Sequence, residues 1–203
     1  MKNLIIMGAI AVLCGNFASA QEMTEEEYLA ALEEALPGKL MNNPLDPRWQ
    51  VYGEDAQKRV VDAEIPGQKA FRVKVKKAKS NPYDIAVQGN VRDAIEEGDV
   101  VLVAFWARAQ SPSKTTGSGH MQFRLQKREA PYTGIVEGNV LLREEWQIHY
   151  LSGVASESYP AGGVSASFNV GHHAQTVELG QFYVMDMGPD VDPADLPSGS
   201  VDP

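Results

Sequence analysis

The heptapeptide Ala70-Phe71-Arg72-Val73-Lys74-Val75-Lys76 carries the pattern that decides the fold of this chain. Apolar and basic side chains alternate in it with a period of two. A β-strand has this period because successive side chains point to opposite faces of the sheet. One face of the strand is therefore predicted to be buried and the other to be exposed, as in an antiparallel sheet with one wet side.

Similar strand patterns recur in both directions along the chain, at residues 49–52, 83–88, 100–108, 121–126, 146–151, 164–170 and 176–185. Joints that contain Gly or Pro separate many of these segments. Roughly eight to ten short strands with such joints are typical of an all-β fold. The sequence predicts a single jelly-roll β-sandwich over residues 40–187.

The alternation also predicts the direction in which individual side chains point. Phe123 is expected in the sandwich core, and its neighbour Arg124 is expected outside. In residues 146–151, the same reasoning puts His149 on the solvent side. Trp106 points away from the face that carries Phe105.

The first twenty residues have the features of a secretory signal peptide. Lys2 precedes an apolar run over residues 4–14, and Ala18-Ser19-Ala20 follows as a small-x-small cleavage site. We expect cleavage before Gln21 and a mature protein without a membrane-inserted segment. The predicted location is periplasmic or secreted.

Residues 21–39 and 188–203 flank the predicted domain. Thr24 and Glu27 form a capping box, which predicts a short helix over residues 25–36. We expect its Leu stripe to pack on the domain rather than to bind a partner. Residues 188–203 are rich in Pro, Asp, Gly and Ser, which predicts a disordered tail.

The composition excludes several classes of protein. The chain has a net charge of −9, which argues against nucleic-acid binding. The single cysteine, Cys14, lies in the predicted signal peptide, so the mature chain has neither disulfides nor thiolate zinc sites. No nucleophile elbow, phosphate loop or metalloprotease motif occurs, and we interpret His149 and the adjacent His172 and His173 as surface residues rather than a base or metal ligands.

One strand face is rich in amides and hydroxyls, contributed by three predicted strands. Such groups suit sugar hydroxyls, which both donate and accept hydrogen bonds, and aromatic rings suit the apolar face of a pyranose. The alternative is that these residues only form the wet face of a sandwich. The candidate ligand-binding residues are Tyr83, Asp84, Gln88, Gln122, Arg124, Gln126, Tyr132 and Asn169.

Several segments resemble the CenC-type carbohydrate-binding modules, which are galactose-binding-like jelly rolls often attached to bacterial glycoside hydrolases. The resemblance covers roughly residues 40–187. The segments that carry it are Asn43-Pro44-Leu45 with Trp49, Gly67-Gln68-Lys69-Ala70-Phe71-Arg72-Val73, Asn81-Pro82-Tyr83-Asp84-Ile85-Ala86-Val87-Gln88, Glu97-Gly98-Asp99-Val100 with Ala104-Phe105-Trp106-Ala107-Arg108, Glu145-Trp146-Gln147, and Thr176-Val177-Glu178-Leu179.

The resemblance implies a glycan ligand on the concave sheet, and it implies that Asp84, Gln88, Arg124 and Asn169 lie on that sheet. We expect no cofactor, although many family members hold a structural calcium ion. Gly180-Gln181 replaces an acidic residue of the family's closing strand, which argues against a calcium site that uses it.

Three functions therefore compete: an exported non-catalytic glycan-binding module, a structural or interaction protein of the cell envelope, and a small glycan hydrolase. A groove rimmed by aromatic side chains favours the first. A flat polar face with an exposed Leu stripe over residues 25–36 favours the second. Two carboxyl groups facing each other across a groove favour the third. Neither the sugar nor the oligomeric state follows from the sequence.

Overall fold

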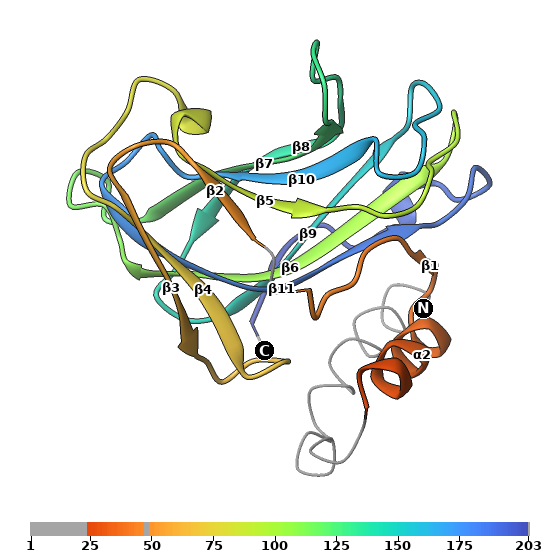
Figure 1. Cartoon of the computed structure of the whole chain (residues 1–203), viewed down its shortest axis with the longest axis horizontal. Helices are drawn as coiled ribbons and strands as arrows, with labels where there is room; N and C mark the ends of the chain where they lie inside the picture. Colours follow the sequence, from red (N-terminus) through yellow and green to blue (C-terminus); the bar gives the residue numbers. More distant parts are fainter. Residues whose placement is uncertain (1–23, 47–48, 203) are drawn as a thin grey trace.

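The computed structural model describes residues 24–46 and 49–202, which form two antiparallel β-sheets packed face to face (Figure 1). The predicted β-sandwich is thereby confirmed. The predicted signal peptide, residues 1–20, lies outside the described residues. Among the described residues, no helix is both long and apolar enough to cross a membrane.

The strands of the seven-stranded sheet run in the order β12-β9-β6-β11-β4-β3, with β1 paired to β11. Their bounds are Lys39–Leu40 (β1), Ala56–Asp62 (β3), Lys69–Val75 (β4), Val100–Ser111 (β6), Gln147–Val154 (β9), Gln175–Asp186 (β11) and Gly199–Val201 (β12). The five-stranded sheet has the order β2-β5-β10-β7-β8. Its strands are Gln50–Tyr52 (β2), Ala86–Asn90 (β5), Gly119–Lys127 (β7), Gly134–Leu142 (β8) and Val164–Asn169 (β10).

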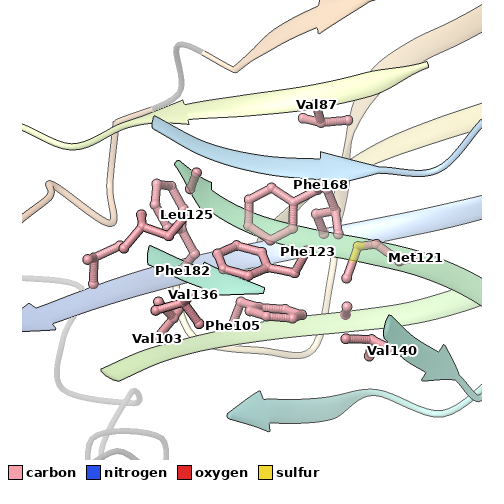
Figure 2. Packing of buried hydrophobic residues seen from close by; sticks show 14 of the residues in the cluster. Val87, Val103, Phe105, Met121, Phe123, Leu125, Val136, Val140, Phe168 and Phe182 are labelled. Atoms are coloured by element: carbon pink, nitrogen blue, oxygen red, sulfur yellow. The ribbon is translucent and has the colours of Figure 1, made fainter. Parts of the chain in front are cut away.

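The main core lies between the two sheets and is built around packed aromatic rings (Figure 2). Phe105 from β6 stacks on Phe123 from β7, with ring centroids 5.3 Å apart. Phe168 from β10 meets Phe123 edge to face, at 5.1 Å. Phe123 is fully buried, as the alternation in residues 121–126 predicts.

A second apolar cluster covers the opposite face of the seven-stranded sheet. The helix α2, Glu25–Ala35, lies under this sheet, on the side away from the five-stranded sheet (Figure 1). Its capping box is present, and Leu32 and Leu36 are buried in the second cluster. Trp106 points into the same cluster, away from Phe105, as predicted. The Leu stripe of α2 thus packs on the domain.

The prediction of a disordered tail over residues 188–203 is wrong for its described part. Residues 193–195 form the 3-10 helix η3, Pro193–Asp195, and β12 pairs with β9 as the sheet's last strand. Leu196 is buried, and Val191 and Val201 pack on the second cluster. These few apolar side chains are enough to order the tail, because the outer face of the seven-stranded sheet is already apolar where they pack.

The predicted orientation of β9 is also wrong. His149 is buried in the sandwich interior, where its ring stacks on Phe105 at 5.3 Å. Ile148 and Tyr150 face the second cluster instead of the main core. Both faces of β9 are covered, so the alternation alone could not tell which one lies between the sheets.

Candidate functional site

The outer face of the five-stranded sheet carries a groove with a volume of about 490 Å³. Its floor consists of polar side chains from β2, β5, β7 and β10, because the apolar side chains of these strands point to the main core. The residues that line the groove are Gln50, Tyr52, Tyr83, Ala86, Gln88, Asn90, Arg124, Gln126, Arg128, Tyr132, Ser167 and Asn169.

Strand register aligns the polar side chains of the groove in rows that cross the sheet. In the central row, Gln50 pairs with Gln88, Gln88 with Ser167, Ser167 with Arg124, and Arg124 with Glu137. Neighbouring strands lie about 4.8 Å apart, so the four strands of this row that line the groove, β2, β5, β10 and β7, span about 14 Å. The groove is thus elongated across the sheet.

The next row contains Asn169 between Ala86 and Gln122. Ser167 Oγ donates to Asn169 Oδ1 at 2.8 Å, and Asn169 Nδ2 donates to Gln122 Oε1 at 3.2 Å. This chain of hydrogen bonds fixes the rotamers of the floor. The small side chain of Ala86 leaves the space beside Asn169 open.

Three exposed tyrosines line the groove: Tyr52 on β2, which is 48% exposed, and Tyr83 and Tyr132, which each sit in a turn held by hydrogen bonds. Tyr83 lies in the 3-10 helix η2, Pro82–Asp84, and is 61% exposed. Tyr132 lies in the loop between β7 and β8, which stands above the sheet in Figure 1, and is 49% exposed. Its N–H donates to the carbonyl of Glu129 at 2.9 Å, and its own carbonyl accepts from Arg124 Nη2 at 3.1 Å.

Gln126 differs from the other polar residues of the floor because it is nine-tenths buried. Its Oε1 accepts no hydrogen bond within residues 24–46 and 49–202. A buried amide oxygen without a donor is unfavourable, typically by about 1–3 kcal/mol. A ligand hydroxyl that reaches this amide would remove that cost.

The groove brings six of the eight predicted ligand residues together: Tyr83, Gln88, Arg124, Gln126, Tyr132 and Asn169. Gln122 lies beside the groove and bonds to Asn169. Asp84 does not line it. Its carboxylate accepts from the backbone N–H of Asn81 at 2.9 Å and holds the η2 turn that presents Tyr83.

The predicted strand over residues 83–88 therefore begins later, at Ala86, and the η2 turn precedes it. This turn presents Tyr83 to the groove, while Ile85 stays buried. The lining residues that are not among the predicted ligand residues are Gln50, Tyr52, Ala86, Asn90, Arg128 and Ser167. Asn90 and Arg128 each lie two positions beyond a predicted residue, so continuing the alternation would have found them.

Trp106 and His149 of the seven-stranded sheet do not form a site. Trp106 is buried in the second cluster, and His149 is buried between the sheets. Burial lowers the pKa of His149 to about 4, so its imidazole is neutral at pH 7.

A smaller hollow of about 330 Å³ adjoins the groove at Asn169. His120, His172 and His173 gather there, with the His120 and His173 rings 4.3 Å apart. Burial and the two neighbouring imidazoles lower the pKa of His173. In the described part of the chain, no group of three or more His, Cys, Asp or Glu side chains is arranged to hold a metal ion.

Comparison with protein families and curated proteins found no relatives: no family model and no curated protein matches this chain. Solved structures do match. A CBM4 carbohydrate-binding module superposes with a TM-score of 0.53 at 21% identity, over 68% of this chain and 94% of the module.

The second N-terminal cellulose-binding domain of Cellulomonas fimi β-1,4-glucanase C matches with a TM-score of 0.53 at 20% identity, over 74% of this chain and 92% of that domain. A Stig cyclase from Fischerella sp. TAU shares the architecture at 9% identity, with a TM-score of 0.55 over 71% of this chain and 87% of the cyclase. At these identities the likeness concerns the fold. The resemblance to CenC-type modules is confirmed at that level: the chain has the β-sandwich fold of the CBM4 carbohydrate-binding modules.

Proposed function

We propose that this protein is an exported, non-catalytic carbohydrate-binding module that holds an oligo- or polysaccharide in the groove of the five-stranded sheet. The observation that carries this proposal is the groove itself, with a floor of amides and hydroxyls and three exposed tyrosines, Tyr52, Tyr83 and Tyr132, along it. Sugars need this combination because each ring has polar edges and apolar faces.

The floor and the rim contribute differently to binding. Gln88, Gln126 and Asn169 offer both donors and acceptors to sugar hydroxyls, at the cost of releasing water. Tyr83 and Tyr132 offer ring faces held by ordered turns, so little conformational freedom is lost on binding. We expect weak affinity, because a shallow, wet site only exchanges hydrogen bonds to water for hydrogen bonds to the sugar.

The chemistry of the groove argues against the hydrolase alternative. Glycoside hydrolysis needs two carboxyl groups that flank the scissile bond. No Asp or Glu is among the described residues that line the groove. Glu137, at the end of the central row, is engaged by Arg124, with 2.6 Å between Arg124 Nη2 and Glu137 Oε1.

The envelope-interaction alternative has the N-terminal helix or the acidic tail as its contact, and an exposed Leu stripe on the helix would favour it. Leu32 and Leu36 are buried on the seven-stranded sheet, and Leu29 packs against the same cluster. The helix therefore offers no apolar stripe for a partner, and the glycan-binding function is preferred.

The test is a binding screen of the purified protein on a panel of soluble polysaccharides, followed by calorimetry on the best ligand. Tyr83→Ala and Tyr132→Ala should each weaken binding about tenfold, since each removes a stacking face. Val60→Ala removes an exposed apolar side chain from β3, on the other sheet, and should leave affinity unchanged. If no polysaccharide binds, or if neither tyrosine matters in a folded variant, the proposal is wrong.

A further inference from the structure

The groove differs in charge from the rest of the molecule. The chain has a net charge of −9, with 27 acidic residues. The described residues that line the groove include two arginines and no acidic residue. A groove with this charge favours an anionic ligand over a neutral one.

The two arginines of the groove are in different electrostatic states. Arg124 forms an ion pair with Glu137, donating from Nε at 3.0 Å and from Nη2 at 2.6 Å, and Nη2 also donates to the Tyr132 carbonyl. Its charge is balanced, and it serves to hold the Tyr132 loop. Arg128 forms no ion pair within the described part of the chain.

The Arg128 side chain extends over the end of the groove. Arg128 follows the end of β7, and its Nη2 donates to Asn90 Oδ1, at the end of β5, at 2.9 Å. Because β10 lies between β7 and β5, the side chain must cross the start of β10, where Nη2 also approaches the Val164 carbonyl at 3.5 Å. Nε and Nη1 donate to no described residue, so donors remain for a ligand.

We infer that the ligand is a glycan with anionic units, and that Arg128 binds a carboxylate or sulfate group of such a unit. The inference rests on the proposed function and specifies its substrate class. A guanidinium presents its donors in a planar fork that matches two oxygens of a carboxylate or a sulfate. Asn90 holds the guanidinium in place through a neutral acceptor, so its positive charge stays available.

The test compares hexasaccharides of equal length and different charge by calorimetry: an oligogalacturonate, a sulfated carrageenan oligomer and neutral cellohexaose. At least one anionic hexamer should bind about tenfold more tightly than the neutral one, the gain expected from a single charge-assisted contact. The two anionic arms distinguish carboxylate from sulfate. Raising the salt from about 50 to about 300 mM should reduce the preference, because Arg128 is exposed.

Arg128→Gln should remove most of the anionic preference and should change the affinity for cellohexaose less than about twofold. Arg59→Gln is the matched control, because it makes the same charge change on β3 of the other sheet. A neutral hexamer that binds as well as both anionic ones, or an Arg128→Gln variant that keeps the preference, overturns this inference and leaves the proposed function standing. If neither these hexasaccharides nor any polysaccharide of the panel binds, both the inference and the proposed function are wrong.

Discussion

Glu178 and His149 are both buried in the seven-stranded sheet, and the protein accommodates these two ionisable side chains in different ways. Glu178 is 1% exposed and accepts hydrogen bonds from Arg72 and from Arg108, whose Nε lies 2.6 Å from Glu178 Oε2. His149 stays neutral instead. Its Nδ1 lies 2.7 Å from Ser200 Oγ on β12, and its Nε2 has no partner among the described residues.

The neutral state of His149 predicts that stability falls in acid. Burial lowers its pKa to about 4, so the unfolded chain binds a proton at this residue near pH 6.5 and the folded chain does not. The contribution of the neutral His149 to the free energy of unfolding is complete above about pH 6.5. It decreases by on the order of 3 kcal/mol as the pH falls toward 4.

The measurement is the free energy of unfolding in urea at several pH values. His149→Phe keeps a ring against Phe105. The free energy of unfolding of this variant should change little between pH 6.5 and 4, even if the variant is less stable than the wild type at pH 7. His172→Phe changes an exposed histidine that is the smallest of the causes lowering the pKa of His173, so it should keep nearly all of the wild-type slope. An unchanged slope in His149→Phe would show that another group titrates with folding.

At the scale of elements, the helix and the tail together close the outer face of the seven-stranded sheet. Leu32 of α2 and Leu196 after η3 enter the same apolar cluster as Trp106. Strand β12 extends the sheet at β9 by three residue pairs. Segments that look peripheral in the sequence therefore form part of the hydrophobic structure.

Removing one apolar contact of the tail should destabilise the whole domain. Leu196→Ala is expected to cost about 2–3 kcal/mol, because Leu196 is 6% exposed and its loss leaves a cavity. The matched control Leu141→Ala changes a leucine that is 63% exposed on β8 and should cost less than about 0.5 kcal/mol. Equal costs in chemical denaturation would mean that the tail contributes no packing in solution.

At the scale of the whole molecule, the outer faces of the two sheets differ in what covers them. The seven-stranded sheet is covered on its outer face by α2 (Figure 1) and by the tail. The outer face of the five-stranded sheet carries the groove. The main core couples the two sheets through the rings of Phe105, Phe123 and Phe168. Substitutions on the groove side can thus change binding without removing packing from the helix side.

Export is the prediction that concerns the whole chain. The basic residue Lys2, the apolar run and Ala18-Ser19-Ala20 predict cleavage before Gln21. Fractionation of expressing cells and N-terminal sequencing of the product should give an exported protein that begins at Gln21. Cys14→Ser should not alter the mature product, and a cytoplasmic protein that retains Met1 would rule out export.

The sequence by itself determined the local features of this protein. The period of two in residues 121–126 was sufficient to put Phe123 in the core and Arg124 on the outer face, since the pleat alternates side chains without reference to any other segment. The capping box at Thr24 likewise depends on residues three positions apart. Such signals were enough for the β-sandwich and for the outward direction of Gln88, Arg124 and Asn169.

Only the tertiary structure decided what covers each face and which residues meet across strands. The alternation around His149 is the same whether His149 or its neighbours Ile148 and Tyr150 face the main core. The second apolar cluster, which takes Ile148 and Tyr150, leaves His149 between the sheets. The pairing of Arg124 with Glu137, and the reach of Arg128 to Asn90, follow from strand order and register. These depend on contacts between segments far apart in the chain, which a local period does not encode.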